Sequence, residues 1–597
     1  MIMQTLSESG MKEILIINLT RMGDLLQTTP LMAGLKERHP GSRITLLVNS
    51  AFTEICRGIP FIDDLIDFDM KDYRKRLLDK KYSLVDNYHV IEHLISRIDS
   101  REYDLTINIT HSRISAILTS FIRTKEIRGF SIDAEGHRVI KHPWMRYFFN
   151  VIPNRNYNPF HLVDMYLKIG GVKPEIKGLI YHTAREDEEK AALLLEREGI
   201  REGDMLVGFH LGASKSDKTW PVSSYAELAG MIARVYGANI VLFGSSGEAD
   251  LAGQFEVKAH VRPVNFVGKT NVGELAALLR RCRLFISNDT GPLHIATSVG
   301  TRVIDISTAN VHFMETGPYG EGHYVIQAEL PCVPCGFDVK CTDMICKSFI
   351  TPSAVFQVVR KALEGHGNNF MDNVPSFSNM QVYKSHVKDD GYLGFTPLIT
   401  RPINKEIFYR ILYRQLWNME TELPGEEEDM IRKRISREMS CYSPFDHLPE
   451  TMSVIRMEHH ILARLADKSE EGLNLISLIA EEAAKDTMDK RKIKEIWETV
   501  APVDTEIELI GHTHPCFRPL ILIFMYAKES LEGNDLITIS GASRSVYEDL
   551  MNRSRNMRQL MTAAIYIAEG KSEGKCCELT TGQKALSVYG GHNSACI

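Results

Sequence analysis

The sequence predicts an α/β protein in which two doubly wound units face each other across a cleft, followed by a mainly helical region. Three observations carry this prediction: the length of 597 residues, a strand–loop–helix alternation that starts twice, and the loss of that alternation after residue 363. One hydrophobic core does not support so long a chain, because domains of about 100–200 residues are the norm. We therefore expect three domains, at residues 1–180, 181–366 and 367–597.

The first unit begins with a strand that is buried on both faces. Residues 14–19 form an apolar run that is interrupted only by Asn18, which is typical of a parallel sheet covered by helices. The polar segment 20–24 follows, and we expect it to be a loop at the carboxyl end of that strand. Further strands are expected at residues 44–48, 65–68 and 105–109.

The alternation restarts at a charged helix over residues 186–198. Strands are expected at residues 206–210, 240–243, 284–287 and 302–306, and helices at residues 272–282 and 292–299. Ser224 and Glu227 have the spacing of a capping box at the start of another helix, and Gly237 fits its end. These elements predict a second Rossmann-like sheet.

The remaining third of the chain lacks this alternation, and we interpret residues 381–570 as mostly helical. The apolar run at residues 520–527 is far shorter than the ~20 residues of a spanning helix, so it predicts a buried core segment. The last ~25 residues are expected to extend freely. The N-terminal residues lack the pattern of a secretory signal, which favours the cytoplasm.

The composition is that of an ordinary soluble protein, with 44% apolar and 25% charged residues. The net charge of −7 and the pI near 6.3 give no global attraction to nucleic acid, and no such partner is expected.

The most informative segment, Asn288–His294, joins a buried strand to the start of a helix. Thr290 stands at the N-cap, Gly291 allows close backbone approach, and Pro292 fits the first turn. Free amides and the positive end of the helix dipole would then face the cleft, where they suit a diphosphate; His294 would add a donor. The alternative is a capped helix with incidental polar residues.

Two other strand ends supply partners for this segment. In residues 212–221, Lys218 would give a point charge to a leaving diphosphate, or it is a solvated surface lysine. In residues 243–248, Glu248 would accept from ribose or sugar hydroxyls, or it caps a helix. Across the cleft, Asp24 would act as the base that deprotonates an acceptor hydroxyl, or it caps the next helix.

Four segments together resemble glycosyltransferase family 9, the ADP-heptose:lipopolysaccharide heptosyltransferases. They are ILIINLTRMGDLLQTTPLMAGLKERHPGSRITLLV, SDKTWP, FGSSGE and SNDTGPLHIATSVGTRVIDI, and the resemblance covers residues ~12–363. It implies a GT-B fold, inverting transfer from an ADP-activated heptose, and no cofactor for the chemistry. By position, Asp24 matches the catalytic base and Lys218 the lysine on the donor phosphate. Glu248, Asp289, Thr290, Gly291 and His294 match donor-binding positions.

The resemblance implies an ADP-sugar as donor and an anionic glycan or lipid as acceptor. The extension of ~230 residues departs from the family pattern and leaves the acceptor open: lipopolysaccharide, another glycan or a protein. Another nucleotide sugar is an alternative donor. A hypothesis of a different class is a non-catalytic scaffold on a degenerate transferase core.

Cys332, Cys335, Cys341 and Cys346 lie within fifteen residues, although the chain has only eleven cysteines. Four thiolates satisfy tetrahedral zinc or iron, so we expect a structural metal, with free thiols or a redox pair as alternatives.

Basic and aromatic residues alternate in residues 137–164, which suits peripheral contact with anionic lipid at the inner membrane or with a phosphorylated glycan. The alternative is a loop and helix packed on the first unit.

Overall fold

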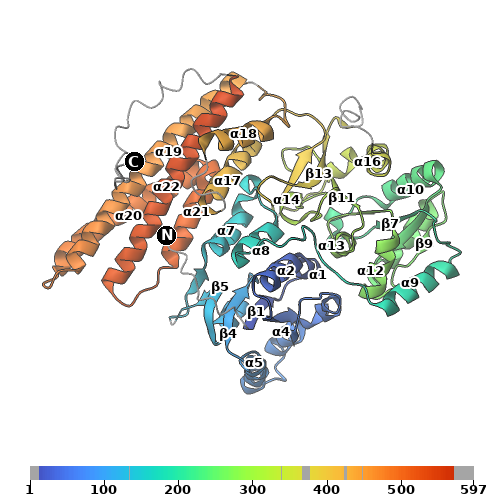
Figure 1. The fold of residues 1–597 in the computed structure, drawn as a ribbon, viewed down its shortest axis with the longest axis horizontal. Helices are drawn as coiled ribbons and strands as arrows, with labels where there is room; N and C mark the ends of the chain where they lie inside the picture. The colour runs from blue at the N-terminus through green and yellow to red at the C-terminus, as the bar shows by residue number, and fades with distance from the viewer. Residues whose placement is uncertain are drawn as a thin grey trace, which may run out of the picture.

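The computed structural model describes residues 13–133, 135–337, 339–365, 377–421, 427–446 and 448–570. These residues form two mixed sheets and a helical region (Figure 1). The first sheet is drawn in blue to cyan, the second in green to yellow, and the long helices in orange to red. In the part of the chain that is described, no helix combines the length and apolar character needed to cross a bilayer.

The first sheet has six strands in the order β3-β2-β1-β4-β5-β6. They are β1 Glu13–Asn18, β2 Arg43–Asn49, β3 Asp64–Phe68, β4 Tyr103–Asn108, β5 Thr124–Ile132 and β6 Arg138–Lys141. All neighbours are parallel except β5 and β6. The central strand β1 is fully buried from Ile14 to Ile17, as its apolar run predicts.

The segment after β1 differs from the expected loop, because helix α1 (Met22–Gln27) begins inside it. Asp24 therefore lies in the first turn of a helix, where its Oδ2 accepts the Arg21 backbone N–H at 3.1 Å. A carboxylate in this position satisfies an amide that would otherwise lack a partner at the helix start.

The second sheet has eight strands in the order β14-β13-β12-β11-β10-β7-β8-β9. They are β7 Leu206–His210, β8 Asn239–Phe243, β9 Val264–Asn265, β10 Leu284–Ser287, β11 Val303–Ser307, β12 Tyr324–Ala328, β13 Met380–Val387 and β14 Leu393–Pro397. Its helices include α9 Arg185–Arg197, α10 Val222–Tyr236, α12 Val272–Arg281, α13 Gly291–Ser298 and α16 Pro352–Glu364. The predicted strands and helices of this unit are confirmed to within a few residues.

Two expectations for this half are wrong. Strands β13 and β14 were expected to be helical, yet they extend the sheet antiparallel from β12 and cover its edge. The sheet thus continues beyond the boundary expected at residue 366. Helix α10 begins at Val222 with Pro221 as its N-cap, so Ser224 and Glu227 do not form its capping box. Gly237 ends the helix with a φ of +63°, as expected.

The helical region contains α17 Lys405–Thr421, α18 Glu428–Met439, α19 Leu448–Ala483, α20 Lys490–Thr513, α21 Arg518–Glu529 and α22 Leu536–Ala568. Helix α19 packs along both α20 and α22 in an elongated bundle (Figure 1). The apolar run at residues 520–527 lies in α21 and is largely buried, as predicted. The expectation for the last residues, 571–597, falls outside the described chain.

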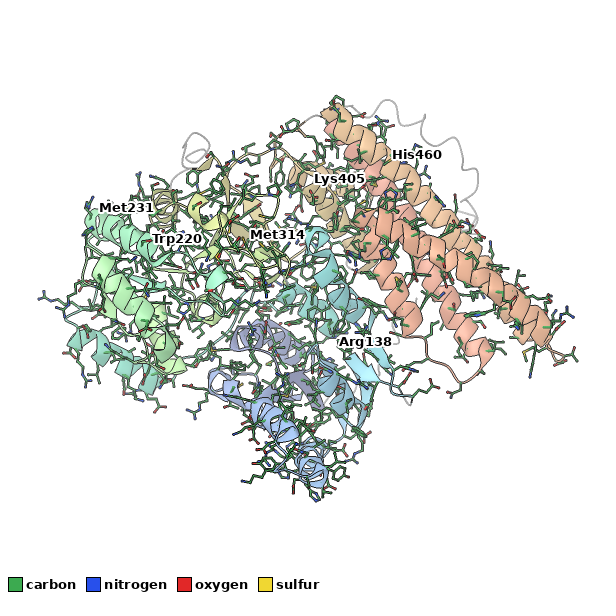
Figure 2. All side chains as sticks on the ribbon, turned by 180° about the vertical axis from the view of Figure 1, so that it is seen from behind. Arg138, Trp220, Met231, Met314, Lys405 and His460 are labelled. Atoms are coloured by element: carbon green, nitrogen blue, oxygen red, sulfur yellow. The ribbon has the colours of Figure 1, made fainter. Side chains whose placement is uncertain are left out.

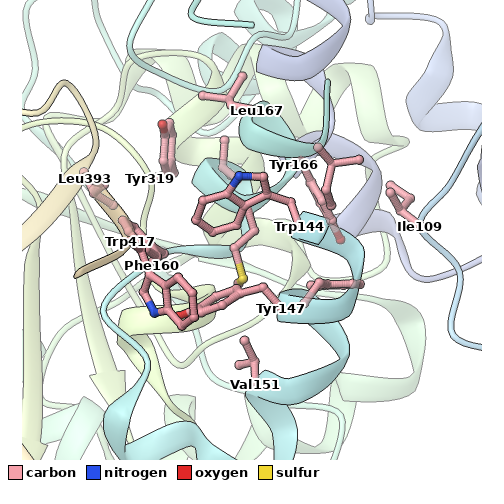
Figure 3. Packing of buried hydrophobic residues seen from close by; sticks show 14 of the residues in the cluster. Ile109, Trp144, Tyr147, Val151, Phe160, Tyr166, Leu167, Tyr319, Leu393 and Trp417 are labelled. Carbon is pink, nitrogen blue, oxygen red and sulfur yellow. The ribbon is translucent and has the colours of Figure 1, made fainter. Parts of the chain in front are cut away.

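Much of the basic and aromatic segment at residues 137–164 is packed inside the protein, as its alternative interpretation expects. Its helix α7 (Pro143–Val151) buries Trp144, Tyr147 and Phe148, and the Tyr147 ring packs 5.2 Å from that of Trp417 in the helical region (Figure 3). Lys141 forms an ion pair with Glu532 at 2.9 Å. These buried aromatic side chains fix the helical region to the first sheet, and contact of the segment with lipid stays a prediction.

Candidate active site

The predicted donor residues converge at the carboxyl ends of β7, β8 and β10. Lys218 ends a short 3-10 helix, η3 (Ser216–Lys218), in the segment after β7, and Glu248 ends another, η4 (Ser246–Glu248), after β8. Asp289 and Thr290 connect β10 to α13. Because these strands are parallel neighbours, segments that are far apart in the sequence emerge at one edge of the sheet.

Lys218 and Asp289 face each other, with 4.0 Å between Nζ and Oδ2. The Lys218 side chain is only 16% exposed, so it is not a freely solvated surface lysine. Burial raises the pKa of Asp289, and the positive charges of Lys218 and Arg155 oppose that rise. Lys218 and Asp289 thus form a partly buried ion pair at the edge of the sheet.

The start of α13 has the predicted layout with one difference. Thr290 occupies the N-cap position, but its hydroxyl does not cap the helix. Its Oγ1 lies 3.2 Å from His210 Nδ1 and 3.1 Å from Ser287 Oγ. Thr290 and Gly291 are half-buried, and a Cβ on Gly291 would come within 2.5 Å of the Met22 side chain, so the positive end of this helix dipole lies at the contact between the halves.

Glu248 has both of its oxygens engaged within the protein. Oε2 accepts from the Ser245 backbone N–H at 2.7 Å and from the Ser245 hydroxyl at 2.9 Å, as a helix-capping acid does. Oε1 lies 3.1 Å from His210 Nε2. Burial raises the pKa of Glu248, but the bonds from His210 and Ser245 outweigh it and hold the pKa at about 2.

Asp24 and His294 lie where the two halves touch. A Cβ on Gly23 would come within 2.7 Å of the His294 ring, so the backbone of α1 lies directly against α13. Gln27 Nε2 lies 3.3 Å from His294 Nε2. Burial raises the pKa of Asp24, whereas the Arg21 amide and His294 lower it. Burial lowers the pKa of His294 to about 4, so this ring is neutral near pH 7.

Sequence reasoning missed three residues of this site: His210, Gln27 and Arg155. His210 joins two of the predicted residues, and Arg155 crosses between the halves, with its Nε 2.8 Å from Glu315 Oε2. A polar residue at the end of a buried strand was the available signal for His210. Arg155 and Gln27 gave none, because their partners lie more than 150 residues away.

The four clustered cysteines do not form a preformed metal site in the described residues. All four are free thiols, and no three of their sulfurs lie within 4.8 Å of one another. Tetrahedral thiolate ligation at about 2.3 Å from the metal would need sulfurs roughly 3.8 Å apart. A metal at Cys332, Cys335, Cys341 and Cys346 would therefore require this loop to rearrange.

A separate cavity of about 500 Å³ lies between the second sheet and α17. Met314, at the centre of the molecule in Figure 2, and Arg410 contribute to its wall. Helix α14 (Phe313–Thr316) separates this cavity from Asp289, because Thr316 at its other end donates to Asp289 at 3.5 Å. No predicted site residue lines this cavity.

Comparison with known proteins agrees with the resemblance. Residues 91–342 match the sequence model of glycosyltransferase family 9 (heptosyltransferase). The chain is 25% identical over 319 residues to lipopolysaccharide core heptosyltransferase OpsX of Haemophilus influenzae, which covers 52% of this chain and 82% of that protein. It is 26% identical over 297 residues to lipopolysaccharide heptosyltransferase 3 of Escherichia coli K12, and this match covers 49% of the present chain and 80% of that protein.

Among solved structures, a glycosyltransferase of family 9 from Veillonella parvula is similar to this chain. The two are 23% identical with a TM-score of 0.48, and the match covers 60% of this chain and 98% of that one. On the sequence matches, we conclude that this chain carries a glycosyltransferase family 9 domain and is a glycosyltransferase.

Proposed function

We propose that this chain is an inverting glycosyltransferase that moves heptose from ADP-heptose onto lipopolysaccharide or another glycan, with its two sheets in the GT-B arrangement. The observation that carries the proposal is the placement of Asp24 on one side of the contact between the halves and of Lys218, Asp289 and Thr290 on the other. The names of the sequence relatives favour this donor and acceptor.

In this proposal the second half holds the nucleotide sugar with its diphosphate at the start of α13. Lys218 and the helix dipole face the negative charge that develops as the bond between the sugar and the diphosphate breaks. These groups are fixed in place before the reaction, so they stabilise the departing diphosphate without costly reorganisation.

Asp24 acts from the first half as general base. The acceptor oxygen attacks the anomeric carbon on the face opposite the diphosphate, and Asp24 takes the hydroxyl proton as the new bond forms. The Arg21 amide bonds to Oδ2, and the Thr20 side chain also hydrogen-bonds to this carboxylate, so Asp24 is held in a fixed position.

The test is transfer from ADP-heptose to extracted lipopolysaccharide precursors, with the product identified by mass spectrometry. A heptose-sized mass increase on the glycan supports the proposal. Transfer of a different sugar, or onto protein only, would replace the donor or acceptor named above. A purified chain that binds no ADP-sugar in calorimetry would favour a scaffold.

A further inference from the structure

A continuous hydrogen-bonded chain runs behind the proposed diphosphate pocket. It starts at Glu248 in η4, passes through His210 at the end of β7, and reaches the hydroxyl of Thr290 at the N-cap of α13. Glu248 Oε1 lies 3.1 Å from His210 Nε2, and His210 Nδ1 lies 3.2 Å from Thr290 Oγ1. His210 is only 4% exposed, so water does not compete for either nitrogen.

The ionisation of Glu248 determines which nitrogen of His210 carries a proton. Glu248 is ionised, because burial raises its pKa but its hydrogen bonds lower it further, to about 2. An ionised carboxylate only accepts hydrogen bonds, so the proton facing it must be on His210 Nε2. The state of Nδ1 is then set by the charge of the imidazole.

When His210 is neutral, Nδ1 has a lone pair and needs a donor. The hydroxyl of Ser287 also lies near but donates to the Asn288 carbonyl at 2.7 Å, which leaves the Thr290 hydroxyl as the donor to Nδ1. The Thr290 oxygen then presents only lone pairs to the space in front of α13. Lone pairs repel an anion there.

When His210 is charged, Nδ1 carries a proton and donates it to Thr290 Oγ1. The hydroxyl hydrogen of Thr290 is thereby released and can point to an anion at the helix start. Protonation of His210 thus changes the Thr290 hydroxyl from an acceptor to a donor toward the proposed diphosphate pocket.

We propose that His210 is a positioning residue which, as an imidazolium, turns the Thr290 hydroxyl toward the donor diphosphate, so that donor binding is coupled to protonation of His210. This inference rests on the proposed function, because it assumes that the pocket at α13 holds a nucleotide diphosphate. No bond to the sugar is made or broken in this step; a proton alone moves onto His210.

Other titratable groups on these elements are Asp217 and Lys218 after β7, Asp289 before α13, His294 within it, and Asp305 in β11. Among the described residues, Glu248 is the only ionisable side chain within hydrogen-bond distance of His210. Because Glu248 only accepts hydrogen bonds in this arrangement, the proton taken up on donor binding goes to His210 Nδ1. Donor affinity is therefore higher where protons are more available, and it falls as the pH rises.

The experiment is calorimetric titration of ADP-heptose into the full chain between about pH 5.5 and 8.5. The diphosphate of this donor is esterified at both ends and does not titrate in that window. We expect the wild-type dissociation constant to rise with pH, by up to about tenfold per unit. Paired buffers of different ionisation enthalpy should show proton uptake on binding at the alkaline side.

Variants separate this role from a merely structural one. His210→Gln should bind with a constant that does not change with pH and that equals the wild-type value at the alkaline end. Thr290→Val should also lose the pH dependence, and Thr290→Ser should retain it because the hydroxyl is kept. A fold loosened by substitution would weaken binding at every pH, which is a different pattern.

The inference is overturned if the wild-type affinity is independent of pH, or if His210→Gln is weaker than wild type by one constant factor throughout. It is also overturned if Thr290→Val keeps the wild-type pH dependence. A wild-type chain that binds no ADP-heptose at any pH would remove the proposed function itself, and the coupling with it.

Discussion

The site around Asp289 and the cysteine loop at residues 332–346 differ in how distance along the sequence relates to distance in space. His210, Lys218, Glu248 and Asp289 are spread over about 80 residues, yet hydrogen bonds and ion pairs link them in two pairs at one sheet edge. The four cysteines lie within fifteen residues, yet no three of their sulfurs gather within 4.8 Å.

The difference lies in what holds each group. Parallel strands fix the directions of the segments that follow them, so side chains at neighbouring strand ends meet whatever their separation in the sequence. The structure assigns no helix or strand to the described residues between Cys332 and Cys346, and one backbone bond, from the Cys335 amide to the Ala309 carbonyl at 2.9 Å, ties this loop to the second half. Proximity in a loop does not by itself close a ligand set.

The largest effect should come from removing the proposed base. Asp24→Asn should lower kcat for transfer by about 10²- to 10⁴-fold, because the amide cannot accept the acceptor proton. Binding of the donor should change little. Asp69→Asn is the matched control, since Asp69 also caps a helix after a strand of the first sheet, accepting from the Asp72 amide at 2.8 Å. Equal activity of Asp24→Asn and wild type would refute the assigned role.

The pH dependence of kcat is a second test of Asp24 as the base. Burial raises the pKa of Asp24 above its usual value, and a base works only when ionised. The wild-type kcat should therefore fall as the pH drops through this raised pKa, at a higher pH than an ordinary aspartate would give. A rate that stays constant down to pH 4 would contradict the assignment.

Removing the positive charge of Lys218 should have the next largest effect. Lys218→Met should lower kcat/KM by about 10- to 100-fold, because the charge opposite the diphosphate is lost while much of the side-chain volume is kept. Lys215→Met is the control: this lysine is three residues away but exposed. Equal losses in both variants would indicate a general charge effect rather than a positioned group.

A smaller effect is expected where the halves meet. Gly23→Ala would place a methyl group within 2.7 Å of the His294 ring and force the halves apart, at a cost of about 1–3 kcal/mol. Transfer should fall several-fold, and the melting temperature should fall slightly. Gly230→Ala, also in a helix but with open space around its Cβ, should leave both unchanged. Unchanged transfer in Gly23→Ala would mean that this contact is absent in solution.

The smallest effect on catalysis should come from the cysteine loop. If Cys332, Cys335, Cys341 and Cys346 do hold structural zinc or iron, elemental analysis should find about one metal per chain, and Cys335→Ser should abolish it. The melting temperature should then fall by a few degrees with kcat almost unchanged. If the purified wild-type protein contains no metal, the four cysteines are free thiols, as they are in this structure.

Much of the fold followed from residue patterns because those patterns act locally. The apolar runs at residues 14–17 and 206–209 had to be buried strands, and Gly237 had to end a helix, for reasons contained within a few residues. Strands β13 and β14 were missed because only the first three residues of each form a continuous buried run, and because β12, the partner of β13, lies about 50 residues earlier in the chain. Strand pairing over such a distance is decided by the free edge it covers.

The sequence by itself determined the two Rossmann-like halves and the set of polar residues at their strand ends, because hydrophobic periodicity and turn chemistry are local. Only the tertiary structure decided that His210 links Glu248 to Thr290, that Gly23 lies against His294, and that the aromatic residues of α7 are buried under the helical region. Those outcomes depend on which surfaces meet when elements far apart in the chain pack together, and no short stretch of sequence encodes that choice.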